Sequence, residues 1–189
     1  NAERRRRQTA EWDVRSVERR VSAAGLDDKE KQTVLSAREA MRARLREQLP
    51  ELEARNATVE EMLAVVAESR ELYEDMLVET MTDEELQAFY EADRWGRRQQ
   101  RRVDELTTNV GLDDDQKTLV DEAYTEMRVA IGDGYVLMSE GYLDRRAAHQ
   151  STHLLRETFT DNVRQILTPE QFQTYESSSG SGRDRWRGF

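Results

Sequence analysis

The sequence predicts an all-α protein built from two tandem helical-hairpin units of long, bent helices. Apolar residues recur at three- and four-residue steps along most of the 189 residues, which is the spacing of one helix face. A helix-start pattern, consisting of an apolar residue, a capping Asp or Thr and a Glu or Gln three residues later, appears four times. Asp27 and Asp113 are 86 residues apart, and so are Thr82 and Thr168, which predicts a gapless duplication.

The composition narrows the class of protein. Hydrophobic residues make up 37% and charged residues 36%, with nine Gly and two Pro, which favours exposed helices with narrow apolar stripes. A net charge of −10 argues against a general nucleic-acid binder, whose phosphate contacts need positive surface. The sequence contains no cysteine, so disulfides and thiol chemistry are excluded. No apolar run approaches the roughly 18 residues of a membrane span.

The first copy opens with a basic segment, residues 1–9, which we interpret either as a solvated end or as the stub of a juxtamembrane segment. Because the chain starts with Asn1 rather than Met, we expect a processed signal, a removed anchor or a trimmed end ahead of it. A short helix then ends near Gly25, and a long helix starts at Asp27. Pro50 is expected to kink or end that helix.

The return helix of the first copy starts at a capping box formed by Thr58 and Glu61. The segment after Asp83 is expected either to continue as a connector helix past Gly96 or to kink there. The first unit therefore covers residues 10–93.

The second unit, residues 94–179, repeats the plan with helix starts at Asp113, Asp144 and Thr168. Gly132 and Gly134 stand near the register that Pro50 occupies in the first copy, which predicts a bend there too. A Ser/Gly-rich linker from Ser177 leads into an Arg- and aromatic-rich tail, residues 180–189, expected to be flexible.

The motif Leu167-Thr168-Pro169-Glu170-Gln171, its three echoes and the 55-residue spacing within each copy resemble the LTxxQ family of periplasmic stress proteins, which includes Spy and CpxP. The resemblance covers nearly all of each copy. It implies bent hairpins that form an elongated or cradle-shaped body, here as a monomeric pseudo-dimer or a homodimer. It also implies a periplasmic or otherwise exported protein. Family chaperones tend to be basic on the concave face, whereas this chain is acidic.

His149 and His153 stand four residues apart on a predicted helix, and Glu157 continues the same face. This spacing is typical of sites for Zn, Ni, Co or Cu. The alternative is a pair of ordinary polar residues beside the apolar stripe, because the aligned residues of the first copy are Leu63 and Ala67.

Two further groups are candidate protein-binding residues, and both combine arginine with aromatic side chains. They are Arg94, Trp95, Arg97 and Arg98 at the start of the second unit, and Trp186 and Phe189 in the tail. Such patches suit an acidic partner. The alternative for the first group is that its arginines balance neighbouring acids and the helix dipole.

We find no phosphate-binding loop, nucleophile elbow or cysteine nucleophile, so the sequence predicts no enzyme and no cofactor. The first hypothesis is an ATP-independent chaperone that binds unfolded or partner proteins. The second is a periplasmic metal- or stress-sensing regulator, anchored to the membrane by a missing N-terminal segment. The third is a helical structural adaptor that docks through its C-terminal tail.

Overall fold

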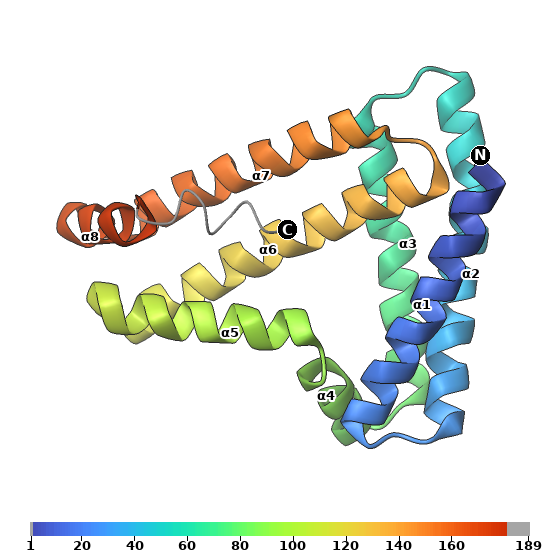
Figure 1. The fold of residues 1–189 in the computed structure, drawn as a ribbon, viewed down its shortest axis with the longest axis horizontal. Helices are drawn as coiled ribbons and strands as arrows, with labels where there is room; N and C mark the ends of the chain where they lie inside the picture. The colour runs from blue at the N-terminus through green and yellow to red at the C-terminus, as the bar shows by residue number, and fades with distance from the viewer. Residues whose placement is uncertain (1, 181–189) are drawn as a thin grey trace.

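The computed structural model describes residues 2–180, and within this range the chain is helical without a strand (Figure 1). The elements are α1 (Ala2–Ala24), α2 (Asp28–Ala54), α3 (Val59–Thr80), α4 (Asp83–Glu91), α5 (Arg94–Leu106), the π-helical turn η1 (Thr107–Gly111), α6 (Asp114–Glu140), α7 (Arg145–Ile166) and α8 (Pro169–Gly180). The predicted all-α class is therefore confirmed for the described part of the chain.

The helix bounds repeat with the period of the sequence. The pairs α2/α6 and α3/α7 each start and end 86 residues apart, and α4 and α8 start 86 residues apart. The two hairpins also have matching cores. Five buried pairs at this offset are Ala37 and Ala123, Leu77 and Val163, Met81 and Leu167, Leu86 and Phe172, and Phe89 and Tyr175. The helix α5 takes the place of α1 in the second copy, since Val17 and Val103 are both fully buried.

The helix starts follow the capping chemistry read from the sequence. Asp27, Thr58, Thr82 and Asp113 each accept a hydrogen bond from the backbone three residues on, and the acid or amide there accepts the cap's N–H. Thr168 does the same with Gln171, at 3.3 Å and 3.0 Å. Local side-chain chemistry therefore sets where these helices begin.

Two of these capping residues also bind each other. The Nε2 of Gln116 donates to Oε1 of Gln171 at 2.8 Å, and Nε2 of Gln171 donates back to Oε1 of Gln116 at 3.0 Å. Gln171 also donates to the carbonyl of Gly111 at 2.9 Å, and Gln116 to that of Ile166 at 3.2 Å. The start of α8 is thus fastened to the start of α6.

The two hairpins cross, with α6 and α7 running across the direction of α2 and α3 in the view of Figure 1. A third core lies at the crossing and consists of Leu45, Leu49, Met62, Val66, Leu137, Leu143 and Ala148. The contributions are not equivalent, because Leu49 is fully buried whereas Tyr135, its aligned residue, is 47% exposed. Exposed Glu51 likewise aligns with buried Leu137. The tip of the second hairpin therefore packs on the first hairpin through residues that the first tip lacks.

Ion pairs accompany the third core. Arg70 of α3 contacts the Asp133 carboxylate of α6 at 3.2 Å and 3.5 Å, and Arg42 of α2 contacts Glu140 at 3.5 Å. Both acids are more than nine-tenths buried. Burial raises the pKa of Asp133, although the hydrogen bond and charge of Arg70 oppose the increase. Removing one partner of such a pair is costly, because it leaves the other charge buried.

Some local expectations about helix boundaries were wrong. Pro50 does not end its helix, whereas the kink expected there and the bend expected at Gly132 and Gly134 stay predictions. Pro50 is exposed, so the carbonyl that loses its partner can face water, while buried Leu49 beside it keeps the helix packed. The connector predicted after Asp83 breaks at Ala92 and Asp93, ahead of Gly96.

The ends of the helical segments also differ from expectation. The first helix already begins at Ala2, within the predicted basic segment, and α8 extends through Ser177 to Gly180. The predicted tail beyond residue 180 lies outside the described residues. The unit boundaries at residues 10 and 94 remain predictions.

Candidate protein-binding groove

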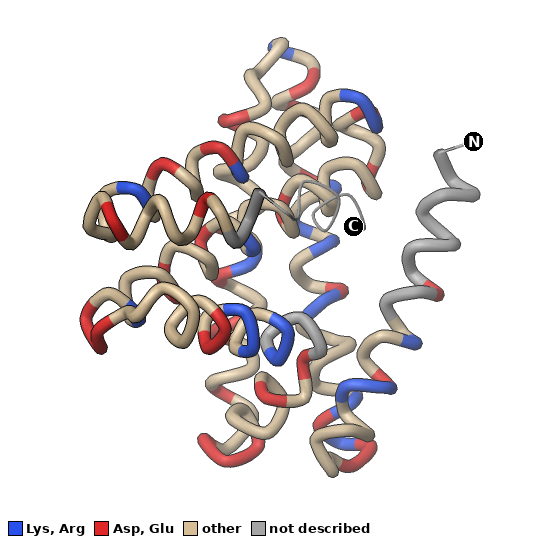
Figure 2. The backbone as a smooth tube through the Cα atoms, turned by 60° about the vertical axis from the view of Figure 1, so that its left-hand side comes forward, with Lys and Arg blue, Asp and Glu red and all other residues tan. Residues whose placement is uncertain are grey.

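The helix α5 has a buried polar face and an exposed basic one. Gln99 and Val103, one turn apart, are more than nine-tenths buried, and Gln99 points to α6. The Nε2 of Gln99 donates to Oδ1 of Asp121 at 2.9 Å and to Oγ1 of Thr125 at 2.7 Å. This anchoring turns the arginine-rich side of α5 outward, and Figure 2 shows Lys and Arg positions in close succession along this segment.

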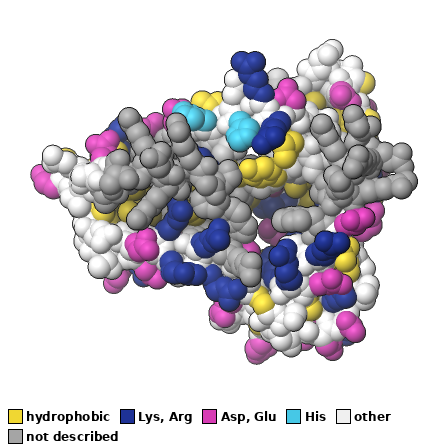
Figure 3. Space-filling view, in the orientation of Figure 1, with side chains coloured by type: hydrophobic (Ala, Val, Ile, Leu, Met, Phe, Trp, Pro, Cys, Tyr) yellow, Lys and Arg dark blue, Asp and Glu magenta, His cyan; other side chains and the backbone are white. Residues whose placement is uncertain are grey.

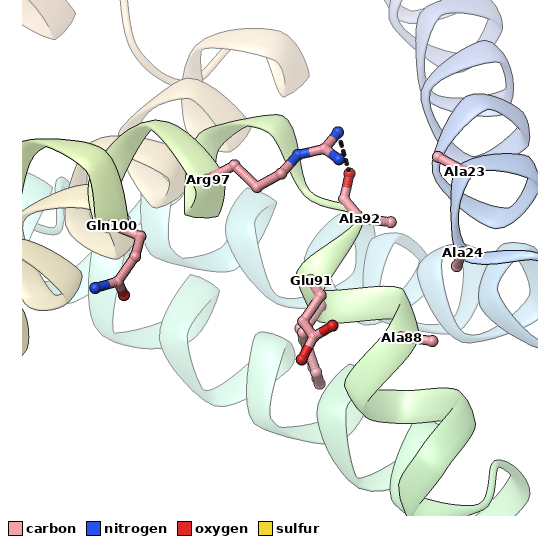
Figure 4. Close-up of a pocket in the computed structure, with 8 residues that line it drawn as sticks. Ala23, Ala24, Ala88, Glu91, Ala92, Arg97 and Gln100 are labelled. Carbon is pink, nitrogen blue, oxygen red and sulfur yellow. Dashed lines mark hydrogen bonds between the residues drawn. The ribbon is translucent and has the colours of Figure 1, made fainter.

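The exposed face of α5 borders a groove at the junction between the two copies (Figure 4). The groove has a volume of about 620 Å³ and is open to solvent. Its lining comes from α1, α4 and α5 and consists of Ala23, Ala24, Ala88, Tyr90, Glu91, Ala92, Arg97 and Gln100. Four of the eight lining residues are alanine, and we call these four the alanine floor; the rest of the lining includes one acid, Glu91, and one base, Arg97. A partner backbone can approach such a floor closely.

Arg20 of α1 holds the α4 wall of the groove in place. Its guanidinium lies 3.8 Å from the centre of the Phe89 ring, and its Nε donates to the Phe89 carbonyl at 2.7 Å. This arrangement combines a cation–π contact with a hydrogen bond to the last turn of α4. Burial lowers the pKa of Arg20, with nearby Asp93 opposing the decrease. Tyr90, the next residue after Phe89, is 45% exposed, and burial of its other side raises its pKa.

Two contacts fix the angle between α4 and α5. The Nη2 of Arg97 donates to the Ala92 carbonyl at 3.5 Å, and Arg128 of α6 forms an ion pair with Asp93 at 3.2 Å. Figure 4 shows Arg97 reaching across the break toward Ala92 while Ala23 and Ala24 face it from α1. The two walls of the groove therefore belong to different copies and meet at Ala92–Asp93.

The predicted protein-binding residues have different outcomes. Arg97 lines the groove, and Arg98 is exposed next to it on α5. The side chains of Arg94 and Trp95 lie outside the described residues, as do Trp186 and Phe189 entirely. The alanine floor was missed, because it brings together segments about 65 residues apart and single alanines carry no sequence signal.

The candidate metal ligands lie on α7, and Figure 3 shows the His side chains in the upper part of the visible face, above a group of Lys and Arg side chains. His149, His153 and Glu157 are all exposed, and Nδ1 of His153 is 3.4 Å from Oε1 of Glu157. Among the side chains that the structure describes, no group of three or more His, Asp or Glu residues is arranged to hold a metal ion. The metal site remains a prediction.

Within the described residues, these features define an all-helical protein with a repeated hairpin and an alanine-rich groove, lined by both Glu91 and Arg97, beside the exposed arginines of α5. No family model, curated protein or solved structure matches the chain. The resemblance to the LTxxQ family thus stays a prediction. In the part of the chain that the structure describes, none of the helices has the length and apolarity needed to cross a membrane.

Proposed function

We propose that the chain is a non-enzymatic protein-binding module that holds acidic, partly unfolded segments of other proteins in the α1–α4–α5 groove. The observation that carries this proposal is the juxtaposition of an apolar alanine floor with the exposed arginines of α5. Such a surface offers nonspecific apolar contact and a charge preference together, without a deep pocket.

The distribution of charge supports a partner with acidic segments rather than any unfolded protein. The chain carries a net charge of −10, yet α5 has five arginines within nine residues, Arg94 to Arg102. Figure 3 shows Lys and Arg side chains gathered over the lower part of the visible face, where α5 lies. Exposed pairs of Arg with carboxylates contribute about 0.2–1 kcal/mol each. We therefore expect weak, rapidly reversible binding that declines as salt increases.

The resemblance to the LTxxQ family extends the proposal from a binding module to a chaperone. In this form the protein is exported, acts without ATP and slows the aggregation of unfolded clients, as a monomer or homodimer. The fold suits that role, because its thin helical layers leave surface on several sides of each hairpin (Figure 1). The cradle-shaped pseudo-dimer is part of this proposal.

Peptide titration tests the binding site. A fluorescent peptide of alternating Glu, Leu and Ala is titrated with the protein by anisotropy, against a matched peptide with Lys in place of Glu. We expect the acidic peptide to bind at least about tenfold more tightly, since several Arg–carboxylate pairs add to each other. Arg97→Glu with Arg101→Glu should abolish this preference.

Two controls separate charge from shape. Arg145→Glu with Arg146→Glu makes the same charge change on exposed residues of α7 and should leave peptide binding nearly unchanged. Ala23→Trp fills the groove without changing charge and should weaken binding. Equal binding of both peptides, or full binding by the Ala23→Trp variant, would refute the groove as the site. Suppression of client aggregation without ATP then tests the chaperone form.

A further inference from the structure

The α6/α7 hairpin contains a seam that divides its packing into two parts. On one side, Ile131 of α6 and Leu155 of α7 pack against the core of the second copy. On the other side, Leu137 and Ala148 belong to the third core, on the first hairpin. One continuous pair of helices therefore joins two separately packed bodies.

The residues at the seam are small. Gly134 of α6 lies with Ser151 and Thr152 of α7 around a cavity of about 10 Å³, whose remaining lining is Ala130, Ile131, Tyr135, Ala148 and Leu155. The aligned position in the first hairpin holds fully buried Val66 in place of Thr152. The second hairpin thus has a half-buried threonine at the seam where the first has a fully buried valine.

The backbone at the same level is weakened as well. Gly132 and Gly134 lie inside α6, and each costs about 1 kcal/mol relative to alanine in a helix interior. Neither glycine is explained by crowding, because an added Cβ would meet no described atom within 4 Å, and neither has a positive φ. Two glycines that the static fold does not need therefore coincide with a gap in side-chain packing.

We propose that this seam is a hinge about which the core of the second copy swings relative to the first hairpin. Asp133, between the two glycines, is held to Arg70 of the first hairpin, so the fixed body ends there. The moving body then comprises α5, η1, α8 and the parts of α6 and α7 beyond the seam. Its second connection to the fixed body is the break between α4 and α5, where a swing has to carry or break the contacts of Arg97 with Ala92 and of Arg128 with Asp93.

This hinge controls the width of the groove. The groove has α1 and α4 of the fixed body on one side and Arg97 and Gln100 of the moving body on the other. Rotation at the seam therefore moves the basic wall toward or away from the alanine floor. This consequence rests on the proposed binding function, whereas the hinge itself does not.

Distance measurement between spin labels tests the hinge. The chain has no native cysteine, so Ser22→Cys on α1 and Glu105→Cys on α5, both exposed, give two unique labels across the groove. We expect the otherwise wild-type protein to give a broad or two-population distance distribution. Adding Gly132→Ala and Gly134→Ala should narrow it to one population and change the peptide association rate by at least about threefold.

The control is Thr158→Ala, an exposed substitution on α7 away from the seam that also raises helix propensity. It should leave the distance distribution unchanged. A single narrow distribution in the otherwise wild-type protein, or an unchanged distribution in the double alanine variant, would overturn the hinge. If the distance distribution is broad and narrows in the double alanine variant, but the acidic peptide does not bind, then the proposed function is refuted and the hinge is supported.

Discussion

Replacing Gln171 with alanine should cost more stability than the loss of an ordinary helix cap. The side chain accepts hydrogen bonds from the Thr168 N–H and from Gln116, and it donates to Gln116 and to the Gly111 carbonyl. A net hydrogen bond contributes about 0.5–1.5 kcal/mol, and the exposed Gly111 carbonyl can regain water. We therefore expect Gln171→Ala to reduce the free energy of unfolding by about 2 kcal/mol.

The repeat supplies matched controls for this change. Gln173→Ala makes the same substitution at an exposed place one half-turn further along α8, and it should change stability by less than about 0.5 kcal/mol. Glu85 is aligned with Gln171 and caps Thr82 in the same way, at 2.8 Å. Glu85→Ala should therefore cost only about 1 kcal/mol, the value of a cap.

Urea unfolding followed by circular dichroism measures all three variants. A double-mutant cycle with Gln116→Ala should give a coupling energy above about 0.5 kcal/mol between the two glutamines. If Gln171→Ala costs no more than Glu85→Ala, or if the coupling is absent, then the paired amides contribute nothing beyond capping and the reasoning is wrong.

Three further predictions concern the backbone, a buried acid and the crossing of the hairpins. Gly134→Ala should stabilise the protein by about 1 kcal/mol, because alanine favours a helix interior. Gly141→Ala should destabilise it, because Gly141 has a φ of 94°. If urea unfolding showed Gly134→Ala to be the less stable of the two variants, this reasoning about helix propensity would be contradicted. The raised pKa of Asp133 means that the folded state favours its protonated form. The contribution of Asp133 to the free energy of unfolding is therefore full below the pKa that the group has in the unfolded chain, and it is lost as the pH rises through the pKa of the folded state. Wild-type stability relative to Asp133→Asn should therefore increase as pH falls toward about 4, and a decrease would show that Arg70 dominates instead. Leu137→Ala removes a fully buried side chain of the third core and should reduce the free energy of unfolding by about 2–5 kcal/mol. Amide exchange at the crossing should become faster. A reduction below about 1 kcal/mol would show that the protein does not depend on this core.

The positions of the helix starts could be predicted well from the sequence, because capping depends only on residues that are close in the chain. Thr82 and Thr168 lie one residue before their helices, where a side-chain oxygen meets free backbone N–H groups. The repeat added the register, since equivalent residues 86 apart form equivalent helices. These features need no knowledge of tertiary contacts.

The effect of proline and glycine on the helices was predicted less well, because it depends on the tertiary contacts around them. Pro50 was expected to kink or end α2, yet the helix continues to Ala54. Gly132 and Gly134 do not end α6, and the bend expected there stays a prediction. Packing of Leu49 and Leu137 on either side of the crossing overrides the local preference.

The candidate site was predicted only in part. The basic cluster was evident from Arg97 and Arg98, because charge is visible in one dimension. The floor was not, because Ala23 and Ala88 meet only after α1 packs against α4. The partner of Gln171 was missed for the same reason, since a cap is local and Gln116 is 55 residues away.

The most direct test of the groove is chemical-shift mapping of the ¹⁵N-labelled protein with the acidic Glu/Leu/Ala peptide. Binding in the groove predicts the largest shifts at Ala23, Ala88, Tyr90 and Arg97, with both walls responding at the same peptide concentration. Shifts concentrated on α7, near His153, or spread evenly over every exposed arginine, would contradict the account.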